Sequence, residues 1–410
     1  MPQEAHVRVA TGCKFLVLVQ DNKDTTTPTV TVLERDDTPP RAALPRSPTN
    51  THTYRVSAFI DTLKPARGVR FNLAWSYGDY LTDVPVRLGR NVALDAAADA
   101  LVTACDRFSA PRADHSHRFL AKYVEAVRTL RLCLDDQATA TTSETLCAVM
   151  LLLICQIFVP GTRDSRTSHS EGAAQIYRYR GQLQARDEFE RKLIRTLRGP
   201  VLFEALFNPN ISLTEQEWDA LVGCNLADSS LEGKMILCLA RGASLMRRGG
   251  FVLDPQRWNH DRPFCPHLEY EARVVRSDYL PVLTSLRDRF YAIDETALRQ
   301  SSNSELVADL QHCHSLRTYG LALFVGIVLN YIVCVAAGNI LEIVQESQRY
   351  AEEIILLARV GARYRPVGAS LFGICLAAAS VVSSNAETKA IAKELEIEYD
   401  RELSEVYVYN

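Results

Sequence analysis

The sequence predicts an all-α protein: one large multi-helix single domain that follows an N-terminal arm with a β-hairpin. From about residue 61, apolar residues recur at three- and four-residue steps, the spacing of a helix with one buried face. β-Branched runs lie within the first 60 residues. Helices buried on all sides in a large core are apolar all round, and three runs have this character: 146–159, 319–338 and 367–382. We therefore divide the chain into an arm, 1–60, and a helical domain, 61–410.

The composition is that of a soluble globular protein, with 410 residues of which 47% are apolar and 23% charged. The net charge of −3 provides no overall positive field for nucleic acid. The eleven cysteines form no C-x-x-C pair and most have aliphatic neighbours, which predicts buried thiols in a reducing compartment. The start, Met1–His6, lacks the basic and apolar regions of a secretory signal, so we expect a cytoplasmic protein.

The arm contains two runs rich in β-branched residues, Lys14–Gln20 and Thr29–Glu34. Asp21–Asp24 between them is a turn signal, so these runs are predicted to form a hairpin that packs on another part of the protein. A Pro-rich polar stretch, Asp36–Asn50, follows and is predicted to be an extended linker or wrapping arm.

The helical domain opens with an aromatic segment, Asn72–Leu81, and a turn, Val84–Gly89. Asn91 suits the N-cap of a helix over 93–102, because its amide oxygen can accept from free backbone N–H groups. The apolar period predicts further helices over 119–134, 143–158, 168–181, 187–199 with a bend before 200–207, 214–224, 231–246, 270–293, 303–338, 340–363, 367–383 and 386–403. A loop that could act as a lid is expected at 251–267, and a last strand at 406–409.

The run Tyr319–Gly338 reaches the length of about 20 apolar residues that crossing a bilayer requires. Asn330 lies within this run, and Gly320 and Gly326 interrupt it. Because other runs of the chain are similarly apolar, we interpret this one as a core helix and expect no membrane partner.

Three consecutive segments carry a family signal: a helix over Phe119–Leu134, a Leu-rich helix over Ser143–Phe158, and a helix that opens at His169-Ser-Glu-Gly-Ala173 and closes on Arg180-Gly181. This order resembles the regulatory domain of fungal binuclear zinc-cluster transcription factors, which has a Tyr-x-x-Ala-Leu helix, a Leu-rich helix and a His-x-x-Gly-Ala helix. The preceding aromatic segment and turn are also similar, so the resemblance covers the chain from about Trp75 to its end. It implies a helical ligand-sensing domain with a central cleft, in which His169 is a structural residue that is hydrogen-bonded across helices.

The chain departs from this family before Trp75. Family members bind DNA through six closely spaced cysteines, which hold two zinc ions and set a helix in the major groove. The corresponding segment here contains only Cys13, so we expect no zinc cluster and no direct nucleic-acid partner. The remaining alternative is that an upstream exon encodes the zinc cluster.

Two further patterns are interpreted as structural. The basic residues between Arg178 and Arg198 alternate with Glu188 and Glu190 at helical spacing, which predicts a solvated helix face. Asp135-Asp136 is interpreted as a polar turn that ends a helix.

The sequence contains none of the catalytic signatures of nucleophile-elbow hydrolases, zinc proteases, P-loop proteins or dinucleotide-binding proteins. His312 and His314 are separated by one residue, so they lie on different sides of a helix and cannot bind one metal ion together from it. We therefore expect neither a metal nor a cofactor.

The candidate site consists of polar and aromatic residues that interrupt the apolar helices. Tyr331, His314 and Arg178 are the candidate catalytic residues, because each can donate a hydrogen bond to a substrate carbonyl. The candidate substrate-binding residues are aromatic or amide side chains: Trp75, Tyr77, Tyr177, Tyr319 and Asn330. If these groups converge, they line an apolar cavity with a few oriented donors, as in small-molecule sites. The alternative for each is an ordinary core residue whose polar group is satisfied within the protein.

Two functions follow from these observations. In the first, a regulator domain without its DNA-binding head binds a small hydrophobic biosynthetic intermediate and promotes its cyclisation. A pericyclic step such as a Diels–Alder or hetero-Diels–Alder closure fits, because orientation and exclusion of water supply its catalysis without acid, base or metal. In the second, the chain is a transcriptional regulator or co-regulator that acts through a partner in the nucleus. The lack of a basic cluster and of an acidic tail disfavours the second.

The sequence therefore favours a cofactor-independent cyclase of fungal secondary metabolism. Its expected partner is a small hydrophobic metabolite, and a homodimer is the candidate assembly.

Overall fold

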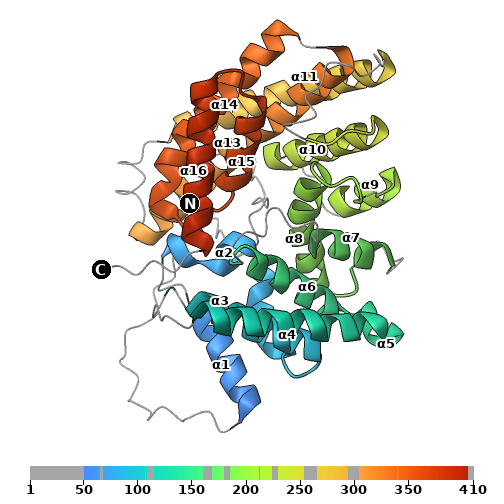
Figure 1. Ribbon diagram of the computed structural model, residues 1–410, viewed down its shortest axis with the longest axis vertical. Helices are drawn as coiled ribbons and strands as arrows, with labels where there is room; N and C mark the ends of the chain where they lie inside the picture. Colours follow the sequence, from blue (N-terminus) through green and yellow to red (C-terminus); the bar gives the residue numbers. More distant parts are fainter. Residues whose placement is uncertain are drawn as a thin grey trace, which may run out of the picture.

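The computed structural model confirms the all-α prediction for the part of the chain that it describes. Each regular element there is an α-helix or a 3₁₀-helix (Figure 1). The predicted hairpin, the linker and the last strand lie outside the described residues. These residues are 50–64, 68–106, 108, 115–159, 169–179, 185–211, 213–223, 230–253, 266–293, 304–338 and 340–404.

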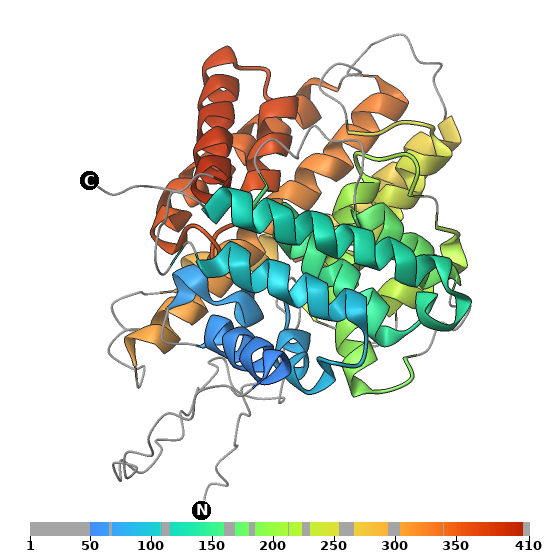
Figure 2. The same ribbon diagram turned by 60° about the horizontal axis from the view of Figure 1, so that its bottom comes forward.

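The first half of the described chain forms one end of the molecule in Figure 1. Its helices are α1 (Thr51–Leu63), η2 (Val69–Phe71), α2 (Leu73–Tyr77), η3 (Asp79–Asp83), η4 (Pro85–Arg87), α3 (Val92–Asp106), α4 (His115–Asp135), α5 (Gln137–Ala140), α6 (Ser143–Gln156) and α7 (His169–Tyr179). The helix α3 packs against α1, α4 and α6. Figure 2 shows α3 and α4 side by side along the outside of this end.

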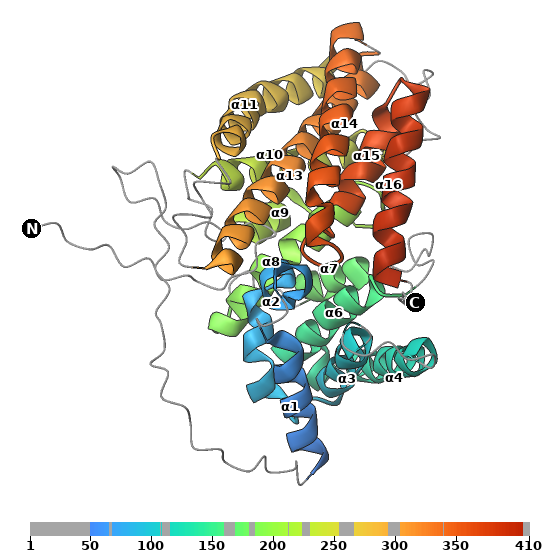
Figure 3. The same cartoon turned by 90° about the vertical axis from the view of Figure 1, so that its left-hand side faces the viewer.

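The second half forms a larger bundle at the other end (Figures 1 and 3). Its helices are α9 (Glu215–Gly223), α10 (Leu231–Arg248), α11 (Pro266–Tyr291), α13 (Glu305–Ala337), α14 (Leu341–Gly361), η6 (Ala362–Tyr364), α15 (Phe372–Val382) and α16 (Ala386–Ser404). The helix α8 (Glu188–Ala205) contacts α6 and α7 of the first half and α9 and α10 of the second. It therefore joins the two ends.

The central helix of the bundle is α13. It contacts α10, α11, α14 and α15, and 89% of its most apolar stretch is buried. It is the one helix among the described residues that is long and apolar enough to cross a membrane. Its enclosure by other helices of the same chain supports the interpretation as a core helix.

Side-chain caps explain where two of the predicted helices begin. The amide oxygen of Asn91 accepts from the backbone N–H groups of Ala93 and Leu94, at 2.9 and 3.0 Å. At the start of α8, the carboxylate of Asp187 accepts from the N–H of Glu190 at 2.8 Å. The Glu190 carboxylate in turn accepts from a backbone N–H just before the helix. This reciprocal arrangement resembles a capping box.

The predicted helix boundary between 187–199 and 200–207 is wrong, because α8 runs through it as a single helix with Pro200 inside. A proline in a helix interior removes a hydrogen bond and costs about 3 kcal/mol. The following residues Val201 and Leu202 are fully buried, and their burial offsets that cost.

The prediction of a solvated basic face holds for Arg191, which is exposed, but is wrong for Lys192 and Arg195 of α8. Lys192 Nζ lies 2.8 Å from the carboxylate of Asp83, and a guanidinium nitrogen of Arg195 lies 3.3 Å from Asp79. Both acids belong to η3, 109 and 116 positions earlier in the chain. Local sequence spacing identified the basic residues, but their acidic partners come from a distant segment.

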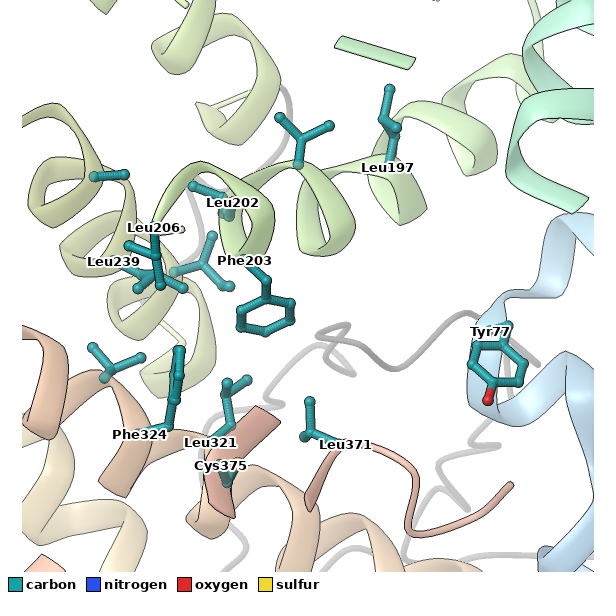
Figure 4. Packing of buried hydrophobic residues seen from close by; sticks show 14 of the residues in the cluster. Tyr77, Leu197, Leu202, Phe203, Leu206, Leu239, Leu321, Phe324, Leu371 and Cys375 are labelled. Carbon is teal, nitrogen blue, oxygen red and sulfur yellow. The ribbon is translucent and has the colours of Figure 1, made fainter. Parts of the chain in front are cut away.

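The buried side chains form one continuous core. Side chains from α8, α10, α13 and α15 meet in Figure 4, where the ring of Phe203 points towards Leu321 and Leu371. The Phe203 and Phe324 rings lie edge to face with centroids 5.7 Å apart, a favourable arrangement for two aromatic rings. Tyr77 of α2 lies at the edge of the same group.

Candidate functional site

The motif that defines the family resemblance brings two of its helices into contact. The hydroxyl of Tyr123 on α4 lies 2.6 Å from Nε2 of His169 at the start of α7, and the two rings meet edge to face. Burial lowers the pKa of His169 and raises the pKa of Tyr123 to about 12, so both groups are neutral near pH 7. The prediction that His169 is hydrogen-bonded across helices is confirmed.

The two candidate residues on α7, Tyr177 and Arg178, lie on different sides of the helix. Tyr177 is buried in the core, whereas Arg178 is exposed and its Nε donates to Glu217 of α9 at 3.1 Å. Adjacent helix positions point about 100° apart, which accounts for the difference. Arg178 therefore joins α7 to α9 at the surface.

Trp75 and Tyr77 anchor α2 to the bundle. The guanidinium of Arg317 on α13 lies 4.7 Å from the centre of the Trp75 ring, and it donates to the carbonyl of Ser76 at 3.4 Å. The hydroxyl of Tyr77 donates to Ser370 at 3.2 Å. Both contacts fix α2 against the second half of the chain.

Tyr319 lies in an aromatic and acidic cluster between α11, α13 and α14. Its hydroxyl donates to Glu353 at 2.6 Å, and its ring stacks on Phe290 with centroids 5.3 Å apart. The hydroxyl of Tyr291 donates to the same Glu353 oxygen at 2.7 Å. One carboxylate thus accepts from two phenols.

His312 extends this cluster by two helical turns. Its ring lies 6.4 Å from Phe290, and its Nδ1 lies 2.9 Å from the hydroxyl of Tyr364 and 2.8 Å from Arg363. His314 is half-buried on a different side of α13, as its spacing from His312 predicted.

Asn330 connects α13 to two of its neighbours in the bundle, α11 and α14. Its carbonyl oxygen accepts from Nε of Arg276 on α11 at 2.6 Å. Its amide nitrogen donates to Glu346 at 2.9 Å and to Ser347 at 3.2 Å, both on α14. Arg276 and Glu346 are also ion-paired. The network satisfies a polar side chain that is only 1% exposed.

Tyr331, the next residue, faces a different neighbour. Its hydroxyl donates to the carbonyl of Val252 at 2.9 Å, and its ring centroid lies 6.2 Å from that of Phe251. Both neighbours belong to the segment that follows α10, which was predicted to be a loop. Tyr331 therefore holds this segment against α13.

The contacts of the candidate residues thus fall in several places. They lie at the α7–α9 surface, at the α2–α13 junction, between α11, α13 and α14, and beside the segment after α10. Sequence analysis missed Glu353, Arg276 and Glu346, because each becomes notable only through a partner on another helix. His312 had a signal in the sequence, since it lies seven positions before Tyr319 and this spacing places both on one face of a helix.

The titrating groups of these clusters favour hydrogen-bond donation over nucleophilic chemistry. Burial raises the pKa of Tyr319 and, to about 12, that of Tyr291, where a hydrogen bond to Glu353 contributes, so both phenols stay protonated near pH 7. The eight described cysteines are buried and unbridged. Burial raises the pKa of Cys313 to about 12, and a thiol in that state is a poor nucleophile.

Among the described residues, no three His, Cys, Asp or Glu side chains are grouped so that they could hold a metal ion. Comparison of the chain with protein-family models, with curated proteins and with solved structures found no match. The resemblance to zinc-cluster regulators therefore depends on the order of the motifs in the sequence.

Proposed function

We propose that this chain is a helical regulatory protein, similar to the regulatory domain of fungal zinc-cluster transcription factors, which acts in the nucleus by binding protein partners. The observation that carries the proposal is the contact between Tyr123 and His169, at 2.6 Å. These residues lie on two of the three helices whose order resembles the family, and their contact gives the motif a physical role. It joins α4 and α7, which both pack on the Leu-rich helix α6.

The alternative function, a cyclase of a hydrophobic intermediate, requires donors that are available to a substrate. Tyr319 and Tyr331 donate instead to Glu353 and to the carbonyl of Val252, and Asn330 has protein partners for both its oxygen and its nitrogen. A substrate would have to replace these partly buried hydrogen bonds, each of which costs free energy to leave unmade. Because the candidate donors are already used within the protein, the regulatory function is favoured over the cyclase.

A reporter experiment in a fungal host tests the proposal. The full chain is fused to a heterologous DNA-binding module, and transcription is compared with that from the module alone. We expect a several-fold change in reporter transcription. The His169→Ala variant should reduce the change, because it loses the contact with Tyr123, while Tyr179→Ala on the exposed side of α7 should not.

An unchanged reporter, with the fusion protein present at the level of the module alone, would overturn the regulatory function. The purified full chain is incubated in parallel with linear polyene precursors. A new cyclic product that requires the folded chain would establish the cyclase instead.

A further inference from the structure

An acidic side chain stands beside three aromatic rings where α11 and α14 pack on α13 (Figure 3). It is the half-buried Glu353, whose Oε1 accepts from the hydroxyls of Tyr291 and Tyr319. Among the described residues Glu353 has no ion pair, whereas Glu346, seven positions earlier on α14, pairs with Arg276. The two phenols hold the carboxylate in place, but they do not balance its negative charge.

The rings of Phe290, Tyr291 and Tyr319 meet as a corner. Phe290 and Tyr319 stack with an interplanar angle of 27° and centroids 5.3 Å apart. Tyr291 stands across both, at 70° to Phe290 and at 69° to Tyr319. Cations are attracted to the faces of aromatic rings, and proteins recognise alkylated ammonium groups by combining several such faces. These three rings and Glu353, together called the aromatic corner, therefore offer ring faces and a negative charge in one place.

Tyr291 is the wall of the aromatic corner that can move. It is the last residue of α11, its side chain is 63% exposed, and its bond to Glu353 lies at the surface. The three rings touch, so a cation enters only when Tyr291 turns away from Tyr319. Exposed side chains change rotamer within nanoseconds, and water replaces a hydrogen bond that is given up at the surface. Tyr319 is 1% exposed and stays in place.

The charges around the aromatic corner leave room for a further cation. Arg287 of α11 is close enough for its charge to act on the two phenols, but it is half exposed and lies 3.7 Å from Asp288. Solvent and salt therefore screen it. His312 and Arg363 contact each other at 2.8 Å on the far side of the Phe290 ring, and Glu352 on α14 adds an exposed negative charge.

We propose that the aromatic corner binds a trimethylalkylammonium group. A quaternary ammonium fits because it donates no hydrogen bond, and its charge is spread over methyl groups that pack on ring faces. The site therefore needs no free donor or acceptor from the protein. The group can belong to a free metabolite or to a trimethylated lysine of another protein. A cation of this size should bind with a Kd on the order of millimolar. The proposal does not depend on the regulatory function.

Ligand-observed NMR of the purified full chain with choline tests the proposal. Saturation transfer from the protein to the choline methyl signal detects binding, and a titration gives the Kd. We expect the neutral analogue, in which a tert-butyl group replaces the trimethylammonium group, to bind at least tenfold more weakly. A peptide with a trimethyllysine is compared with choline in the same assay. Tighter binding of the peptide assigns the site to a protein side chain, and tighter binding of choline assigns it to a free metabolite.

Substitutions in the aromatic corner separate charge from packing. Glu353→Gln keeps an acceptor for both phenols but removes the charge, so the Kd for choline should rise at least tenfold. Tyr291→Leu should raise it several-fold, whereas Tyr291→Phe keeps the ring and should change it less than twofold. Two matched controls should leave the Kd unchanged: Tyr270→Leu, a tyrosine of α11 that is 69% exposed, and Glu352→Gln, the exposed acid next to Glu353.

Arg287→Gln should have the opposite effect and lower the Kd several-fold, because it removes a cation close to the site. Circular dichroism checks the helix content of each variant. Because Arg287 is exposed, its variant keeps the test decisive if Glu353→Gln does not fold.

Three results would each overturn the proposal: no saturation transfer to choline, equal affinity for choline and its neutral analogue, or an unchanged Kd in both Glu353→Gln and Tyr291→Leu. Binding is measured without a reporter, so any of these results leaves the proposed regulatory function untouched.

Discussion

The hydroxyl of Tyr319 on α13 lies 2.6 Å from the carboxylate of Glu353 on α14. Tyr291 of α11 donates to the same oxygen at 2.7 Å, so a single acid joins three helices. Two hydrogen bonds satisfy this half-buried carboxylate. The polar groups at the sides of α13 therefore stabilise the arrangement of the helices around it.

The Tyr319→Phe variant tests this relationship. It removes one donor to Glu353 and leaves the ring packing on Phe290 in place. We expect the free energy of unfolding to fall by about 1–3 kcal/mol in urea denaturation. Tyr291→Phe should cost less, because that side chain is 63% exposed. Equal effects of Tyr319→Phe in the wild type and in a Glu353→Gln background would show that the two residues are not coupled.

The Asn330→Leu variant should be more damaging. It removes the group that accepts from Arg276 and donates to Glu346 and Ser347, and it leaves those partners partly buried. We expect a loss of about 2–4 kcal/mol in the free energy of unfolding. The nearby apolar change Ile332→Val should cost only about 0.5–1.5 kcal/mol. If the two variants lose the same stability, the network contributes nothing beyond packing.

Replacing two helical glycines by alanine should change the free energy of unfolding in opposite directions. No heavy atom lies within 4 Å of a Cβ built at Gly172 on α7. Gly172→Ala should therefore raise the free energy of unfolding by roughly 0.5–1 kcal/mol, because alanine loses less backbone entropy in a helix. At Gly320 on α13 the added Cβ lies 2.8 Å from the ring of Phe372. Gly320→Ala should be destabilising by about 1–3 kcal/mol through overpacking.

Thermal or urea unfolding of both glycine variants measures whether each change raises or lowers the free energy of unfolding. A destabilising effect of Gly172→Ala would contradict this prediction, because it would require a steric contact or a backbone strain at a position where the structure shows open space.

The stability of the protein should depend on the protonation of His169. Burial lowers its pKa below the usual 6.5, so the unfolded chain binds this proton more tightly than the folded protein does. Its contribution to stability is therefore complete above pH 6.5 and is lost as the pH falls through the folded-state pKa. We expect the free energy of unfolding to fall as the pH is lowered from about 7.5 to about 5.

In the His169→Gln variant, the free energy of unfolding should decrease less as the pH is lowered, because glutamine does not titrate. Its side chain can still form a hydrogen bond with Tyr123. The difference between the wild type and the variant separates His169 from the other histidines. Parallel pH profiles for the two proteins would show that His169 stays unprotonated, or titrates alike in both states.

The local rules predicted much of the helical scaffold. The apolar period located α6, α10 and α13 within a few residues, and the amide of Asn91 marked the start of α3, because these signals depend only on neighbours in the chain. The same rules failed at Pro200, where the burial of later residues outweighed the local preference. They also failed for Lys192 and Arg195 of α8, whose acidic partners belong to η3.

The sequence alone determined that the chain forms helices around an apolar core and which of them are most apolar, since periodicity depends on local spacing. The family resemblance implied that His169 is hydrogen-bonded across helices. Only the tertiary structure decided which polar residue meets which. Tyr319, Asn330 and Tyr331 are close together in the chain, yet their partners are Glu353, Arg276 with Glu346, and the carbonyl of Val252. The physical reason is that a helix turns 100° per residue, so its side chains face different neighbours, and the packing of distant helices determines which groups those neighbours present.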